Sequence, residues 1–168
     1  MAERRCALVV IGNEILSGKT QDSNAYFAAR ELRRVGVALE RISVIPDDLD
    51  AIAREVRYCS DYFELVLTSG GTGLSARDRT PQATAAVVDY EVPGLSEAMR
   101  AASLPHARGA MLSRAIAGVR NASLIVNLPG SPKAVRETLS AIVDVLPHAL
   151  ELLAGNATDH HPIGSREG

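Results

Sequence analysis

A glycine-rich loop between an apolar strand and a proline-led helix constrains this chain more than any other stretch. Residues 65–83 read LVLTSGGTGLSARDRTPQA. The apolar run at 65–68 is typical of a buried strand, and three of the four residues at 70–73 are glycine. Because glycine lacks a Cβ atom, its backbone reaches positive φ and lets several amide N–H groups converge. Thr80 followed by Pro81 then predicts the N-cap and the first residue of a helix.

This order of strand, loop and helix favours an anion, because free loop amides and the positive end of the helix dipole face the same space. Asp78 is the one acidic residue in the stretch. An acid beside a phosphate is unfavourable unless a cation lies between them, so Asp78 indicates a Mg²⁺-phosphate site. The alternative is a tight turn in which Asp78 is solvated or stabilises its own loop.

Composition and charge argue against several kinds of ligand and location. The 168 residues have a formal net charge of −2, no Trp and two Phe, so the sequence does not indicate nucleic-acid binding. Cys6 and Cys59 lack a metal-type spacing, and we expect both to be buried free thiols, as in a reducing cytoplasm. The apolar run at 6–11 is too short for a signal peptide, and no later run could span a bilayer. We therefore expect a cytoplasmic protein without membrane contact.

Apolar runs alternate with helical periodicity through the first half of the chain. We expect strands and helices in turn, the strands at 6–11, 38–45 and 64–68, and the helices from a cap at 22–24 through 34, at 49–59 and at 81–89. This alternation implies right-handed βαβ crossovers and a three-layer α/β/α fold with a mostly parallel central sheet. Ligands of such sheets bind beyond the carboxyl ends of the strands. Gly12, Asp47 and the glycine loop all fall at those ends.

The first expected helix has a plausible buried face and several candidate caps. Its apolar positions at helical spacing are Tyr26, Phe27, Ala29, Leu32 and Val35. Asp22, Ser23 or Asn24 could cap its start, because each side chain can accept a hydrogen bond from a backbone amide. A glycine at position 36 is expected to end it.

The second half of the chain is less regular, but it repeats the order of apolar strand, glycine turn and proline-led helix. We expect helices at 93–102, 110–114 and 132–145, a hairpin from the runs at 115–119 and 124–128, and a final helix from Pro147. Pro129-Gly130-Ser131-Pro132 again combines a glycine turn with a helix start. Residues 1–155 are expected to form one domain, and residues 156–168 a flexible tail in which the two adjacent histidines are not a metal site.

Four motifs, in this order along the chain, resemble the molybdopterin adenylyltransferases and their MoaB/Mog-type relatives. They are TSGGTGLSARDRTPQAT, EVPGLSEAMRAAS, AMLSRAIAG and LIVNLPGSPKAVRE, and the resemblance covers about residues 38–155. It implies a three-layer α/β domain that assembles as a homotrimer or a hexamer. The implied activity is Mg²⁺-dependent transfer of AMP from ATP to the terminal phosphate of molybdopterin, with release of pyrophosphate. A molybdenum insertase would then be a partner that uses the product.

The resemblance also implies roles for individual residues. Asp47 and Asp78 match the two acidic positions associated with Mg²⁺ and adenylyl transfer, and Ser113 matches a position in the pterin pocket. Asp22 is a weaker match to an active-site polar position, and Lys133 would help with charge. The implied substrate-binding set is Gly70, Gly71, Thr72, Gly73, Ser113, Pro129, Gly130, Ser131 and Pro132.

The front end of the chain departs from this pattern. IGNEILSGKTQDSNAYFAARELRRVGV is more similar to the opening of the related domain in molybdopterin molybdotransferases, competence-damage-inducible proteins and eukaryotic FAD synthases. Two alternatives therefore stay open, a non-catalytic molybdopterin-binding paralogue or scaffold, and a nucleotide pyrophosphatase of the competence-damage-inducible type. At residue level, Asp47 could instead cap the helix that begins near Leu49, Ser131 could be only an N-cap, and Lys133 could be solvated.

Overall fold

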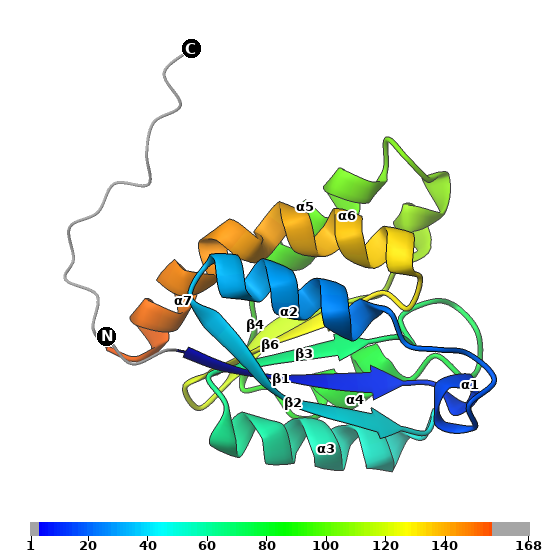
Figure 1. Ribbon diagram of the computed structural model, residues 1–168, viewed down its shortest axis with the longest axis horizontal. Helices are drawn as coiled ribbons and strands as arrows, with labels where there is room; N and C mark the ends of the chain where they lie inside the picture. Colours follow the sequence, from blue (N-terminus) through cyan, green and yellow to red (C-terminus); the bar gives the residue numbers. More distant parts are fainter. Residues whose placement is uncertain (1–3, 156–168) are drawn as a thin grey trace.

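The computed structural model describes residues 4–155, which form a six-stranded sheet between helices (Figure 1). The strands are β1 (Arg4–Ile11), β2 (Val37–Ile45), β3 (Leu65–Ser69), β4 (Tyr90–Glu91), β5 (Ala117–Arg120) and β6 (Ser123–Leu128). Their order across the sheet is β2-β1-β3-β6-β5-β4. Pairs among β2, β1, β3 and β6 are parallel, whereas β5 is antiparallel to both of its neighbours. The predicted mostly parallel sheet is confirmed.

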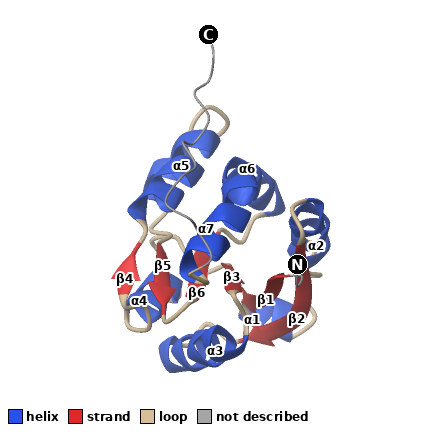
Figure 2. Cartoon of the chain, turned by 90° about the vertical axis from the view of Figure 1, so that its left-hand side faces the viewer, coloured by secondary structure: helices blue, strands red, loops and turns tan. Residues whose placement is uncertain are grey.

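Helices cover both faces of the sheet and complete the three layers (Figure 2). On one face lie α2 (Asn24–Arg34), α5 (Pro93–Ser103), α6 (Pro132–Ile142) and α7 (Leu146–Leu153), and on the other α3 (Leu49–Tyr62) and α4 (Thr80–Ala85). Side chains of the interior strand β1 alternate between the two faces of the sheet. Cys6, Leu8 and Val10 belong to one core cluster, and the residues between them belong to the other. A strand buried on both faces has to be apolar throughout.

Several local elements differ from the sequence-based expectation. A short helix, α1 (Asn13–Leu16), follows β1. The short helix expected at 110–114 is a 3-10 helix that lies two residues earlier, η1 (Arg108–Leu112), and the last turn of the helix expected at 132–145 is a separate 3-10 helix, η2 (Val143–Val145). The helix expected at 81–89 ends at Ala85, because the chain then turns and the Asp89 amide donates to Val119 O as β4 joins the sheet.

The expected buried face of α2 is partly wrong. The side chain of Tyr26 is 78% exposed, whereas Phe27, Ala28 and Leu32 are buried. Glu31 is buried beside them, because it forms ion pairs with both Arg30 and Arg34. A paired carboxylate therefore occupies a core position that an apolar pattern does not reveal.

Both cysteines are buried free thiols, as predicted. Burial raises the pKa of the Cys6 thiol strongly and that of the Cys59 thiol to about 12, so neither is a reactive thiolate at neutral pH. Within residues 4–155 no helix has the length and apolar content needed to cross a membrane. The expected tail lies outside the described residues.

Candidate active site

The glycine loop follows β3 at the carboxyl end of the sheet, where β1, β2 and β3 point in Figure 1. Gly70 and Gly71 both have positive φ, at 103° and 68°. A Cβ atom on Gly70 would collide with the carbonyl oxygen of Ile11, so the loop can approach β1 only with glycine there. The Gly70 amide donates to Leu128 O at 3.2 Å, whereas the amides of residues 71–73 donate to no described residue. Those three amides are free for an anion.

Thr80 has a different role from the one expected. It is the first residue of α4 rather than its N-cap, which is Arg79. Its buried hydroxyl donates to Gly70 O at 2.8 Å, and its amide donates to Gly71 O at 3.1 Å. Thr80 therefore fixes the two glycines from the helix that follows them.

A cavity of about 200 Å³ lies beside this loop. We call it the acidic cavity, because four carboxylate residues line it: Glu14, Asp22, Asp47 and Asp78. Gly70, Gly71, Gly130 and Pro132 of the expected binding set also line it, together with Arg77. The structure thus brings both expected catalytic acids to one place with four of the nine expected substrate-binding residues.

Asp47 is held by the segment that follows β1. Its Oδ2 accepts from the Asn13 amide at 3.0 Å, and Asn13 Oδ1 accepts from the Asp47 amide at 3.3 Å. The interpretation of Asp47 as a helix cap is wrong, because Asp48 caps α3 by accepting from the Ala51 amide at 2.8 Å. Asp47 therefore keeps its second carboxylate oxygen without a hydrogen bond to any described residue.

Asp78 does stabilise its own loop, as the alternative interpretation proposed. Its Oδ2 accepts from the Ser75 amide, and its own amide donates to Ser75 O, both at 2.9 Å. Arg114, which the sequence-based reasoning missed, holds the same loop from outside. Its guanidinium donates to Gly73 O at 2.7 Å and to Asp78 O at 2.6 Å. The loop that carries Asp78 is thereby fixed at both of its ends.

The start of α2 supplies two further residues to the acidic cavity. The N-cap position of α2 is Ser23, whose side chain makes no capping bond, and Asp22 just before it accepts from the amides of Asn24 and Ala25 at 2.9 and 3.3 Å. Asn24 is buried, and its Nδ2 donates to Ser69 Oγ at 2.9 Å and to Gly130 O at 2.8 Å. Asn24 thus ties the end of β3 to the loop after β6. No sequence signal distinguished this role from helix capping.

A second cavity, of about 280 Å³, lies on the other side of the glycine loop. We call it the apolar cavity, because most of its lining surface is apolar; the apolar side chains that line it are Met99, Ala107, Ala110, Leu112, Ala115, Pro129 and Ala134. Thr72, Gly73 and Ser113 of the expected binding set line it as well. Ser113 therefore lies apart from Asp47 and Asp78.

Ser131 and Lys133 line neither of these two cavities. Ser131 Oγ accepts from the Ala134 amide at 3.2 Å and caps α6, which agrees with the simpler interpretation of this residue. The Lys133 side chain is 72% exposed. Both contribute to the start of α6 rather than to a cavity wall.

The acidic cavity has a donor set that suits Mg²⁺. Within residues 4–155 no three His, Cys, Asp or Glu side chains lie close enough together to hold a metal ion. Mg²⁺ is typically bound through one or two carboxylates, with phosphates and water completing its ligands. Asp47 and Asp78, each with one oxygen held by a backbone amide, fit that limited protein contribution.

Comparisons with known proteins agree on one family. Residues 7–148 match the family described as a probable molybdopterin binding domain. A molybdopterin adenylyltransferase from Helicobacter pylori is 44% identical over 115 residues, which cover 67% of this chain and 65% of that relative. The chain thus spans just under two thirds of that relative.

Solved structures extend the similarity to the whole fold. The molybdopterin biosynthesis enzyme MoaB from Thermus thermophilus has a TM-score of 0.85 and 42% identity, covering 90% of this chain and 97% of that one. The molybdopterin biosynthesis Mog protein from Mycobacterium ulcerans has a TM-score of 0.84 and 36% identity, covering 89% of this chain and 99% of that one.

Proposed function

The chain belongs to the family of probable molybdopterin binding domains, and on that basis we propose that it is a molybdopterin adenylyltransferase. It would transfer AMP from ATP to the terminal phosphate of molybdopterin and release pyrophosphate. The name of its Helicobacter pylori relative and the four sequence motifs support this activity. The protein would act in molybdenum cofactor biosynthesis.

One observation carries the proposal: two cavities of different chemistry share two loops. Within the glycine loop, Gly70 and Gly71 line the acidic cavity while Thr72 and Gly73 line the apolar one. Pro129 likewise lines the apolar cavity, and its neighbour Gly130 the acidic one. A nucleotide in the acidic cavity and a pterin in the apolar cavity would therefore meet across the same loops. Joining two bound reactants in this way is itself a large part of catalysis.

The residues of the acidic cavity suit phosphoryl chemistry without a covalent intermediate. The free amide of Gly71, which lines this cavity, would bind a phosphate, and Arg77 would offset part of its charge. Asp47 and Asp78 would hold Mg²⁺, which neutralises phosphate charge as it redistributes during transfer. Attack by one phosphate on another needs orientation and electrostatic stabilisation more than a protein nucleophile.

Further details belong to the same proposal. We infer that the substrates are ATP and molybdopterin, that Mg²⁺ is the metal, and that the protein works in the cytoplasm as a homotrimer or hexamer. A molybdenum insertase would be the partner that receives the adenylylated pterin. These statements rest on the resemblance of the motifs, and the site residues named above are consistent with them.

The test is a single-turnover reaction of the purified protein with molybdopterin, ATP and Mg²⁺, with adenylylated pterin measured directly. We expect one product per active site, and none without Mg²⁺. Tight pterin binding without product would make the protein a non-catalytic paralogue. Hydrolysis of ADP-ribose or FAD without any pterin would instead support the pyrophosphatase alternative.

A further inference from the structure

Most polar groups that line the apolar cavity already have partners in the protein. The Arg100 guanidinium donates to Ala115 O at 3.0 Å and lies within 3.5 Å of Ser113 O. Ser96 Oγ donates to Pro93 O at 3.1 Å, and Thr138 Oγ1 donates to Ala134 O at 2.8 Å. These bonds hold the wall of the cavity together and use the Nη1 donors of Arg100 and the hydroxyl protons of Ser96 and Thr138.

Glu137 is an exception. It lines the apolar cavity from α6, its side chain is only 14% exposed, and it accepts no hydrogen bond from any described residue. Its one ion pair within residues 4–155 joins Oε1 to Lys133 Nζ at 3.9 Å, and the lysine side chain is 72% exposed. So long and solvated an ion pair contributes little. A half-buried carboxylate whose one ion pair is this long still has acceptor capacity for a ligand that enters the cavity.

Ser103 is a second exception in the same cavity. It lies at the end of α5 and is 5% exposed, and its Oγ has no hydrogen-bond partner among the described residues. Nearly all buried hydroxyls in proteins are hydrogen-bonded, so an unpaired one requires an explanation. A buried hydroxyl without a partner and a half-buried carboxylate with one long ion pair thus line the same apolar cavity, and both have hydrogen-bonding capacity for a ligand from outside the chain.

The chemistry of that partner follows from the two side chains. A carboxylate only accepts hydrogen bonds, and it binds best to two parallel N–H donors, as in its pairing with a guanidinium. The apolar lining suits the faces of a flat ring. The ligand is therefore expected to be a flat heteroaromatic ring with two adjacent N–H donors along one edge.

We propose that Glu137 reads the amino-pyrimidinone edge of a pterin bound in the apolar cavity, with Ser103 as an additional polar contact. The ring N–H and the adjacent amino group of a pterin are the required pair of donors. Adenine offers a donor beside an acceptor, so the same carboxylate disfavours it. The residue thus determines which substrate enters which cavity. The inference rests on the proposed function, since it takes the pterin as the occupant of this cavity.

The test compares two ligands and two pairs of variants. Pterin and lumazine differ at one position, where an oxo group replaces the amino group, and both fluoresce, so their binding can be titrated directly. The variants are Glu137→Gln and Ser103→Ala. The matched controls are Glu97→Gln and Ser140→Ala, which change exposed residues outside this cavity on the same two helices.

The unaltered protein should bind pterin at least about tenfold more tightly than lumazine, because lumazine places an oxo group against the carboxylate. Glu137→Gln should weaken pterin at least about tenfold and reverse the preference, because its amide can donate to the oxo group and accept from the ring N–H. Ser103→Ala should weaken both ligands by about threefold to tenfold. The two controls should bind as the unaltered protein does.

Equal binding of pterin and lumazine by the unaltered protein would overturn the inference, and this measurement needs no variant to fold. An unchanged preference in Glu137→Gln would overturn it as well. Either result is compatible with AMP transfer in the single-turnover assay, so the proposed function could stand alone. Failure of the unaltered protein to bind pterin at all would overturn the inference, whereas the proposed function is decided by the single-turnover assay with molybdopterin.

Discussion

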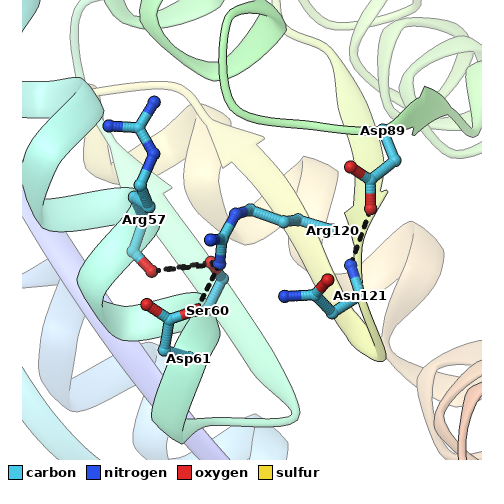
Figure 3. Close-up of polar contacts among 6 residues, drawn as sticks. All are labelled: Arg57, Ser60, Asp61, Asp89, Arg120 and Asn121. Atoms are coloured by element: carbon cyan, nitrogen blue, oxygen red, sulfur yellow. Dashed lines mark hydrogen bonds and ion pairs between the residues drawn. The ribbon is translucent and has the colours of Figure 1, made fainter.

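At the amino end of the sheet, charged side chains pair with one another, whereas at the carboxyl end the acids of the acidic cavity form no ion pair with any described residue. Figure 3 shows the amino end, where Arg120 donates to Ser60 Oγ at 2.9 Å and forms an ion pair with Asp61. Nearby, the Asn121 amide donates to Asp89 Oδ2 at 2.8 Å. Three acids of the cavity, Asp22, Asp47 and Asp78, are likewise held by backbone amides, but no acid of the cavity forms an ion pair with a described residue.

We call the amino end of the sheet the closed end, because Arg5 and Arg120 form ion pairs there. We call the carboxyl end the open end, because the acids of the acidic cavity form no ion pair with a described residue. Arg120 also reaches the carbonyl of Arg57 at 3.5 Å, so it ties the β5–β6 hairpin to α3 (Figure 3). At the carboxyl end, Asp47 and Asp78 are fixed in position but keep their charge unpaired among residues 4–155. Because several such acids line one cavity there, an external cation is expected at that end, and mutations at the two ends should have different consequences.

The largest expected effect is on catalysis at the open end. Asp47→Asn should lower the rate of AMP transfer at least about 100-fold, because it removes a metal-binding charge. The free energy of unfolding should change by less than about 0.5 kcal/mol, since an amide oxygen can still accept from the Asn13 amide. The rate is measured in single turnover and stability by urea unfolding.

The matched control is Asp48→Asn, one residue along. Asparagine caps a helix about as well as aspartate, so both rate and stability should be retained. An equal loss of activity in the two variants would contradict the proposal that Asp47, and not the helix cap Asp48, takes part in AMP transfer.

The next effect is on stability, again at the open end. Gly70→Ala places a Cβ atom against Ile11 O at a φ of 103°, so it should lower the free energy of unfolding by about 2 kcal/mol or more. Gly94→Ala is the control, because nothing lies within 4 Å of its Cβ position. That substitution, near the start of α5, should be neutral or stabilise the protein by up to about 1 kcal/mol. Urea unfolding would compare the two, and a neutral Gly70→Ala would contradict the close packing of the loop on β1.

A smaller effect is expected at the closed end. Arg120→Ala should lower the free energy of unfolding by about 1 kcal/mol, because it removes hydrogen bonds between the hairpin and α3. AMP transfer should be unchanged. Arg54→Ala, an exposed position on α3, is the control. Loss of transfer in Arg120→Ala at full stability would show that the two ends are coupled.

The smallest effect concerns pH. Burial alone would raise the pKa of Glu64, but hydrogen bonds from the amide and guanidinium of Arg5 more than offset it and lower that pKa below its ordinary 4.5. The stability that the pair contributes is therefore present above this ordinary value and is lost as pH falls through the lower pKa of the folded state. Glu64→Gln should make unfolding less sensitive to acid in that range. Identical pH profiles would show that the pair contributes nothing.

The parts of the fold that could be predicted from sequence are those that leave a local pattern. β1 is a continuous apolar run because both of its faces are buried, and the glycine loop shows its backbone requirement in its composition. Thr80 could not be assigned, since a threonine before a proline reads the same whether it caps a helix or binds Gly70. Which of these two roles Thr80 takes is decided by packing between segments that are separate in the sequence.

The site followed the same rule. The sequence motifs marked Asp47 and Asp78 as candidate site residues. That these two acids line one cavity and Ser113 another could not be predicted, because it depends on which side of the glycine loop each residue faces. Asn24 contacts Gly130 across 106 positions of sequence, and Glu137 has the helical spacing of an ordinary solvated acid. Such residues become visible only when the surrounding segments are in place.

The most direct test of the account is to measure pterin binding and AMP transfer together in Asp78→Asn. Asparagine can still accept from the Ser75 amide, so the loop should keep its shape. We predict molybdopterin binding within about threefold of the unaltered protein and a loss of at least about 100-fold in single-turnover transfer. Equal loss of binding and transfer would contradict the division of labour between the two cavities, because Asp78 would then organise both.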